Sequence, residues 1–164
     1  MSVFGINLSL WAQSTAGWLR VKLNPGLTKD FPDMAITCFW RGELTNDEVN
    51  RLHAEAFRHR LLQDDWWGQV TRHSLGWVCA RAGAELVGFV NVAWDGAVHA
   101  FIVDTMVAVQ YQRQGIATQM LAICAREARN AKCEWLHVDF EERLRPFYFG
   151  RAGFVCTDAG LIRL

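Results

Sequence analysis

The sequence lacks an excess of charge of either sign. Its 17 Lys and Arg residues balance 17 Asp and Glu residues, so the formal net charge is zero. A nucleic-acid-binding protein needs surplus cations to neutralise phosphates, and this class is therefore disfavoured. The sequence also lacks a basic amphipathic stretch and any apolar run near the roughly 20 residues that span a bilayer. We expect neither nucleic acid nor a membrane as a partner.

The cysteines lack the spacing of a disulfide framework or a metal site. There are five, an odd number, and none form a CxxC pair. The opening residues MSVFGINLSLW also lack the basic region and the cleavage site of a secretory signal. These absences favour a reduced, cytoplasmic protein. Cys79 and Cys156 lie in alternating apolar runs, so we expect both to be small core residues.

Proline is scarce, and its placement suggests where the main domain begins. Two of the three prolines fall in NPGLTKDFPD, residues 24–33, which is typical of a linker. Before it, VFGINLSLW and GWLRVKL alternate like two strands of a hairpin. A chain of 164 residues favours one domain. We therefore expect residues 1–33 to be an N-terminal extension and residues 34–164 to form the domain.

The pattern of hydrophobic residues predicts a mixed α/β domain. Gly83 and Asp95-Gly96 indicate hairpin turns, and hence antiparallel strands. The segment 97–140 reads as strand, helix and strand, which requires a crossover and a parallel pair. Helices are predicted after a Thr45–Glu48 capping box, around 59–71, at 114–130 and in RLRPFYFGRA. Strands are predicted at 34–40, 76–82, 85–94, 97–109 (apolar on both faces) and 134–140, with one or two more in 154–164.

The polar stretch YQRQGIAT, Tyr111 to Thr118, joins a predicted strand to a predicted helix. A helix N-terminus offers unpaired backbone N–H groups and a partial positive charge, so it suits an anion. Gly115 would let a phosphate or pyrophosphate approach the backbone, and Ala117 keeps the next turn low. The chain has neither GxxxxGK[ST] nor a GxGxxG followed by an acid at the dinucleotide spacing. Taken alone, the stretch reads equally well as an ordinary connection.

Three segments together carry a resemblance to a known family. The residues QRQGIA, 112–117, match the Q/R-x-x-G-x-G/A signature of the GNAT superfamily of N-acetyltransferases. VDTMVAVQYQ resembles the family's central strand, and FYFGRAGF, 147–154, resembles its F-Y-x-x-x-G-F segment. The resemblance covers residues 34–164. It implies a mixed, mostly antiparallel central sheet with a splayed parallel strand pair and helices on both faces.

The resemblance also implies acetyl-CoA as the co-substrate. The backbone of Met106, Val107 and Val109 would pair with the pantetheine arm, and an N–H near Val107 would polarise the thioester carbonyl. Arg113 would add a side-chain contact to phosphate. Gln112 replaces a commoner Arg, with little expected harm because the backbone does most of the binding. The pyrophosphate loop would comprise Gln112, Arg113, Gln114, Gly115, Ile116, Ala117 and Thr118.

Two residues are the candidates for catalysis. Tyr148 falls on the family's tyrosine, the general acid or hydrogen-bond donor for the departing thiolate. Asp104 is the only acid in the 97–109 strand, where a buried carboxylate is costly unless it is paired. It is a base, an anchor for the substrate ammonium, or a structural hydrogen-bonding group. His99 is a weaker candidate, because strand parity places it on the face opposite Asp104.

Candidates on the substrate side are fewer. Trp66 and Trp67 follow a polar stretch and would form an aromatic cleft wall. Glu141 stands where the family often has Asn, and it would contact the substrate or the cofactor arm. His137, Asp139 and Glu141 alternate along one strand face. A strand edge near the cleft explains them more simply than a metal site, and no metal is expected.

These features favour an N-acetyltransferase that moves acetyl from acetyl-CoA directly to a primary amine of a small molecule. Acetylation of a protein lysine or N-terminus is an alternative, and so is a non-catalytic acyl-CoA-binding module. The 1–33 extension would mediate a homodimer by strand addition.

Overall fold

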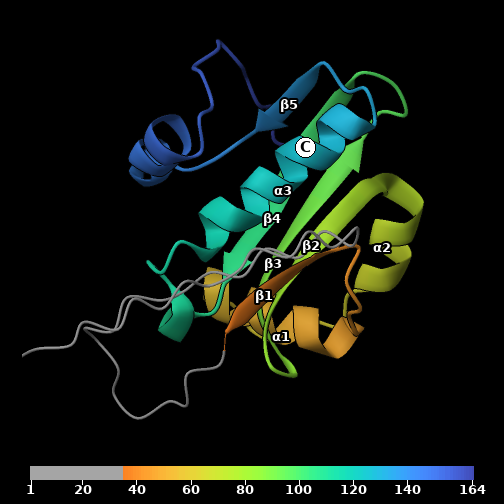
Figure 1. The fold of residues 1–164 in the computed structure, drawn as a ribbon, viewed down its shortest axis with the longest axis vertical. Coiled ribbons are helices and arrows are strands. Elements are labelled where there is room, and N and C mark those ends of the chain that lie inside the picture. The colour runs from red at the N-terminus through yellow and green to blue at the C-terminus, as the bar shows by residue number, and fades with distance from the viewer. Residues whose placement is uncertain (1–34) are drawn as a thin grey trace, which may run out of the picture.

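The computed structural model describes residues 35–164 and shows one mixed sheet with helices on both faces (Figure 1). The predicted hairpin in residues 1–33 lies outside the described residues. The helices are α1 Asn46–Phe57, α2 Trp66–His73 and α3 Ile116–Asn130, with short turns η1 Val109–Tyr111, η2 Glu142–Leu144 and η3 Pro146–Arg151. The strands are β1 Ile36–Trp40, β2 Ser74–Ala82, β3 Glu85–Trp94, β4 His99–Val107 and β5 Trp135–Val138. Within residues 35–164, no helix has the length and apolarity to cross a membrane.

The sheet follows the chain in the order β1-β2-β3-β4-β5. The first four strands pair antiparallel, and only β4 and β5 are parallel. Gly83 and Gly96 have φ angles of 58° and 81°, left-handed values that suit the two hairpin turns predicted there. The mixed sheet with one parallel pair is therefore confirmed.

The two faces of the sheet carry separate hydrophobic clusters. One contains the apolar stripe of α3, and all five of its predicted residues are buried. The other contains Val49 and Leu52 of α1, Trp66 and Val70 of α2, and the fully buried Cys79 of β2. Helix α3 thus covers one face of the sheet, and α1 and α2 together cover the other. The α3 stripe comprises Ile116, Met120, Ile123, Cys124 and Ala128.

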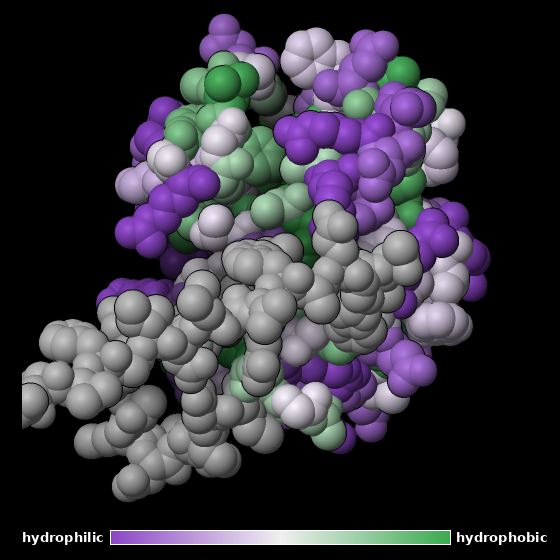
Figure 2. Space-filling view, in the orientation of Figure 1, coloured by the Kyte–Doolittle hydropathy of each residue, from purple (hydrophilic) through white to green (hydrophobic). Residues whose placement is uncertain are grey.

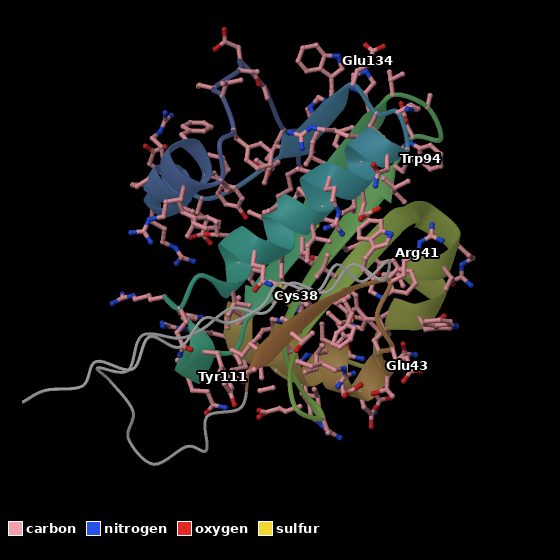
Figure 3. The ribbon with its side chains drawn as sticks, viewed as in Figure 1. Cys38, Arg41, Glu43, Trp94, Tyr111 and Glu134 are labelled. Atoms are coloured by element: carbon pink, nitrogen blue, oxygen red, sulfur yellow. The ribbon has the colours of Figure 1, made fainter. Side chains whose placement is uncertain are left out.

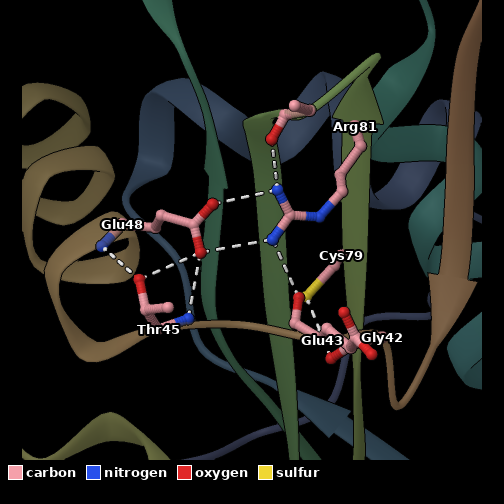
Figure 4. A network of polar contacts seen from close by, with 7 residues as sticks. Gly42, Glu43, Thr45, Glu48, Cys79 and Arg81 are labelled. Carbon is pink, nitrogen blue, oxygen red and sulfur yellow. Dashed lines mark hydrogen bonds and ion pairs between the residues drawn. The ribbon is translucent and has the colours of Figure 1, made fainter.

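The N-terminus of α1 is fixed by the predicted capping box, which joins a larger polar network (Figure 4). Glu48 accepts hydrogen bonds from the backbone N–H and the hydroxyl of Thr45, each at 3.0 Å. Both Glu48 oxygens also contact the Arg81 guanidinium, at 2.9 and 3.2 Å. Arg81 in turn donates to the carbonyls of Glu43 and Ala84. The network ties the start of α1 to the β2–β3 hairpin.

We expect Glu48→Gln to lower the free energy of unfolding by about 1 kcal/mol at pH 7, because Arg81 loses a charged partner. Arg81 holds the pKa of Glu48 below its usual range. The ion pair therefore stabilises the fold above about pH 4.3, the unfolded value, and its contribution disappears as the pH falls through the lower folded-state pKa. Urea unfolding of both proteins across this range checks the prediction.

The control for this experiment is Asp47→Asn, which removes an exposed ion pair to Arg51 on the same helix. That substitution should change stability by under about 0.5 kcal/mol at any pH. A loss of stability in Glu48→Gln that stays constant down to acid pH would contradict the role given to Arg81.

The structure corrects several expectations. No strand forms in residues 154–164, where Cys156, Thr157, Asp158 and Gly160 interrupt the apolar alternation. Cys156 is exposed and is not a core residue. The segment leaves Val155 and Ile162 80% and 88% exposed, and Figure 2 shows hydrophobic side chains at the surface over η3 and this segment. The predicted helix near 59–71 begins later, at Trp66, because the Asp65 side chain accepts from the Gly68 N–H.

The 97–109 strand is also less buried than its composition suggests. Phe101 of β4 is 41% exposed, and His99 is only partly buried. On the other side of the same strand, Ala100 and Ile102 are buried against α3. The first half of β4 therefore has one covered face and one open face.

Candidate active site

The middle of β4 contains a bulge that sets the geometry of the candidate site. The β3–β4 register passes from Phe89↔Met106 to Asn91↔Val103, so two residues of β4, Asp104 and Thr105, lie opposite one residue of β3. Asp104 has φ 54°, in the left-handed region that aspartate enters more readily than most residues. Bulges of this kind redirect side chains and occur often beside active sites.

The outer edge of β4 is open beyond the bulge. Strands β4 and β5 pair only from His99↔Trp135 to Ile102↔Val138. In the part of the chain that the structure describes, residues 103–107 of β4 have no strand on that side. The predicted splay of the parallel pair is confirmed, and it leaves backbone groups able to pair with an extended ligand.

The loop from Gln112 to Thr118, the expected pyrophosphate loop, makes a sharp turn at the start of α3. Arg113 and Gly115 both have positive φ, 62° and 85°. Gly115 is the N-cap of α3, and no side chain caps the helix. A Cβ built on Gly115 would meet nothing within 4 Å, so the approach to the backbone is open. Figure 3 shows Tyr111 at this end of the sheet and Trp94 and Glu134 at the other.

Glutamine side chains brace this loop. The Gln112 amide donates to the Val107 carbonyl at 3.0 Å, and the Gln114 amide donates to the Gln110 carbonyl at 3.2 Å. The Val109 N–H donates to the Glu55 carboxylate of α1 at 2.7 Å. Of the backbone groups expected to meet pantetheine, the Val107 carbonyl and the Val109 N–H thus already have partners, and Glu55 would have to release Val109 first.

Tyr148 lies on η3, at the α3 side of the bulge. Pro146 opens this turn as predicted, and the Tyr148 ring stacks on Phe140 with centroids 4.6 Å apart. Burial raises the pKa of Tyr148, and the nearby Thr105 hydroxyl opposes that shift. Thr105 Oγ1 is nevertheless buried without a hydrogen bond of ordinary geometry to any described residue. Two hydroxyls, those of Tyr148 and Thr105, therefore lie near each other beside the open edge of β4, and Thr105 Oγ1 can still accept or donate a hydrogen bond.

Asp104 points to the opposite side of the sheet, toward α1. Its carboxylate lies 4.0 Å from Nε2 of His53, and the two side chains are 26% and 21% exposed. Burial raises the pKa of Asp104, while His53 acts against the increase. His53 was not among the sequence candidates. Its only signal is a position next to the buried Leu52, at the edge of the apolar stripe of α1.

The parity argument about His99 is wrong, and the bulge is the reason. Ala100 and Ile102 pack toward α3, so His99 faces away from α3. Asp104 faces the same way, toward His53, because the bulge adds one residue and reverses the alternation. His99 contacts His137 instead, with Nδ1 and Nε2 2.8 Å apart.

The remaining sequence candidates lie away from the bulge or behind it. Trp66 is 4% exposed and packs between α2 and the sheet. Trp67 is 51% exposed and lines a cavity of about 670 Å³, and no lining residue comes from β4 or the 112–118 loop. Two other lining residues, Arg41 and Glu43, are labelled in Figure 3. Glu141 is exposed and paired with Arg143.

Comparison with known proteins finds a family match for most of the described chain. A model of the acetyltransferase (GNAT) family matches residues 38–154. A GNAT family acetyltransferase from Streptococcus pneumoniae is 24% identical with a TM-score of 0.63, over 78% of this chain and 98% of that one. No curated protein gave a significant sequence match.

Two further solved structures share the fold. An aminoglycoside acetyltransferase from an uncultured soil metagenomic sample is 14% identical, with a TM-score of 0.63 over 79% of this chain and 94% of that one. AAC(6')-Iy, solved with the bisubstrate analogue CoA-S-monomethyl-acetylneamine, is 15% identical, with a TM-score of 0.61 over 79% of this chain and 97% of that one.

Proposed function

The chain belongs to the GNAT family of acetyltransferases, and we propose that it transfers acetyl from acetyl-CoA directly to a primary amine of a small molecule. The observation that carries the proposal is the bulge in β4. It directs the Asp104 carboxylate to the α1 side, and the neighbouring Thr105 hydroxyl approaches Tyr148 on the η3 side. The incoming ammonium needs a negatively charged acceptor, which Asp104 would be. The leaving thiolate needs a proton or hydrogen-bond donor, which Tyr148 would be.

The residues around the loop fit acetyl-CoA. Arg113 and the uncapped N-terminus of α3 would hold the pyrophosphate, since both favour negative charge. Open space above Gly115 leaves room for that group. The pantetheine arm would run along the unpaired edge of β4, next to Met106 and Val107, and the N–H near Val107 would polarise the thioester carbonyl.

In the reaction, Asp104 holds the incoming ammonium, which must lose a proton before it attacks. The amine nitrogen then bonds to the thioester carbon as the carbon–sulfur bond breaks. Tyr148 donates its proton, or a hydrogen bond, to the departing thiolate. Burial weakens Tyr148 as an acid, but the same desolvation raises the pKa of the thiol and keeps the two groups matched.

The small-molecule acceptor is supported by the bisubstrate analogue in AAC(6')-Iy, which joins CoA to acetylneamine, and by the aminoglycoside acetyltransferase. The chain's zero net charge provides no cationic or anionic surplus that would favour a charged protein partner. Acetylation of protein lysines and acyl-CoA binding without transfer are the competing functions.

Thiol release from acetyl-CoA tests the proposal. The purified full chain is incubated with neamine, with spermidine or with a lysine-containing peptide, and products are identified by mass spectrometry. We expect thiol release that depends on a small amine, with a matching N-acetylated product. Faster acetylation of the peptide than of either small amine would favour a protein acetyltransferase. Binding of acetyl-CoA without thiol release for any amine would leave a binding module.

A further inference from the structure

Next to Asp104, α1 carries a chain of hydrogen bonds that leads to the surface. Nδ1 of His53 lies 2.6 Å from Nε2 of His59, and Nδ1 of His59 lies 2.6 Å from the Arg60 carbonyl oxygen. The turn that ends α1 makes this possible: Arg58 has φ 56°, and the His59 N–H donates to the Ala54 carbonyl. His59 is thereby folded back against His53.

These contacts fix where the ring protons are. A carbonyl oxygen can only accept, so Nδ1 of His59 must carry a hydrogen and, in the neutral ring, its Nε2 must be an acceptor. Nδ1 of His53 must then be the donor between the two rings. In neutral His53 the remaining nitrogen, Nε2, has a free lone pair, and this is the atom that faces Asp104 at 4.0 Å.

Two acceptors therefore face each other across a gap that suits a shared donor. The Asp104 carboxylate and Nε2 of His53 are 4.0 Å apart. A nitrogen about 2.8 Å from each would face them at an angle of about 90°, which two slightly bent N–H bonds of a primary ammonium can span. Phe57 and Trp66 pack against the His53 ring, with centroids 4.6 and 5.2 Å away, and hold its orientation. Trp66 thus supports the site from behind.

We propose that His53 is the base of the reaction, that Asp104 is the anchor for the acceptor ammonium, and that His59 carries the proton to solvent. This rests on the proposed function. One N–H of the bound ammonium gives its proton to Nε2 of His53, and the electron pair left on nitrogen forms the bond to the acetyl carbon. His53 then releases its Nδ1 proton to Nε2 of His59, His59 passes one proton to water, and proton exchange with solvent returns both rings to the Nδ1-protonated form for the next turnover.

The surroundings suit a base that works near neutral pH. Burial lowers the pKa of His53, and the charge of His59 acts in the same direction, while Asp104 on β4 and Asp64 before α2 oppose them. Because its pKa lies below the ordinary histidine value of about 6.5, the His53 ring is mostly neutral at pH 7 and can accept a proton. A primary amine, by contrast, is mostly protonated at pH 7. An efficient base has a pKa close to the working pH.

The first test is the tautomer of each ring, read from ¹⁵N chemical shifts of the full chain at neutral pH without substrate. We expect His53 and His59 both to carry the proton on Nδ1, and His53 to titrate below the ordinary histidine value. A proton on Nε2 of His53, or a charged His53 at pH 7, would overturn the proposal whatever the activity of the protein.

The second test is the pH dependence of neamine and spermidine acetylation in His53→Gln and His59→Gln. We expect His53→Gln to lower kcat/KM for the amine about a hundredfold at pH 7 and to move the rise in rate to higher pH, where free amine accumulates. His59→Gln should lower the rate less and leave acetyl-CoA affinity unchanged. The exposed His73, at the end of α2, provides the control His73→Gln.

The outcomes separate this inference from the proposed function. An unchanged pH profile in His53→Gln, with an active wild type, would contradict His53 as the base and leave the acetyltransferase intact. Absence of thiol release by the wild type would contradict the proposed function itself. The ¹⁵N measurement of the tautomers tests the His53–His59 hydrogen bond independently of any activity.

Discussion

Replacing Gly115 by aspartate is expected to weaken acetyl-CoA binding at least tenfold more than replacing it by asparagine. Both residues tolerate the left-handed φ of 85° better than other side chains do, so the backbone cost is similar. Both would point into open space. Only aspartate sets a negative charge beside the expected pyrophosphate, and a tenfold effect corresponds to about 1.4 kcal/mol.

Thermal unfolding with and without acetyl-CoA measures this difference. A ligand at a hundred times its Kd stabilises the folded state by about 2.7 kcal/mol, and a tenfold weaker Kd halves that gain. The asparagine variant controls for bulk and strain. Equal stabilisation of the two variants would mean that the phosphates do not lie at the start of α3.

Replacing Tyr148 by phenylalanine is expected to lower kcat about a hundredfold while acetyl-CoA affinity stays the same. The phenyl ring preserves the stack on Phe140. Little stability should be lost, because Thr105 Oγ1 makes no ordinary hydrogen bond in the part of the chain that the structure describes. The Tyr148 hydroxyl is therefore expected to act on the leaving thiolate and not to stabilise the fold, so its removal should affect the chemical step alone.

The control is Tyr111→Phe, which removes the hydroxyl of the chain's other tyrosine. That hydroxyl donates to Glu85 at 3.2 Å, away from the bulge. Thiol release under saturating acetyl-CoA and amine gives kcat for both variants. A Tyr148→Phe protein with wild-type kcat would show that the thiolate leaves without help from this residue.

Local patterns in the sequence predict most of the fold. The capping box at Thr45 and Glu48, the turns at Gly83 and Gly96 and the apolar stripe of α3 each act through neighbours a few residues away. The C-terminal strands do not form although their apolar residues alternate. A strand needs a partner as well as a pattern, and polar residues at 156–158 interrupt this one.

The candidate site depends on contacts that no local pattern encodes. The loop at Gly115 carries a signature, but the bulge at Asp104 appears only in the register between β3 and β4. That single extra residue reverses the facing of Asp104 and brings it to His53, 51 positions earlier in the chain. The role of His53 also requires its bond to His59, which the left-handed turn at Arg58 creates.

Calorimetric titration of acetyl-CoA into the purified wild-type chain tests the central claim most directly, since transfer requires that the loop and the open edge of β4 hold this molecule. The account predicts saturable binding of one acetyl-CoA per chain, competed by CoA and weakened by added salt because phosphates carry the charge. The absence of saturable binding would contradict it, and the turn at Gly115 would then be only a connection between a strand and a helix.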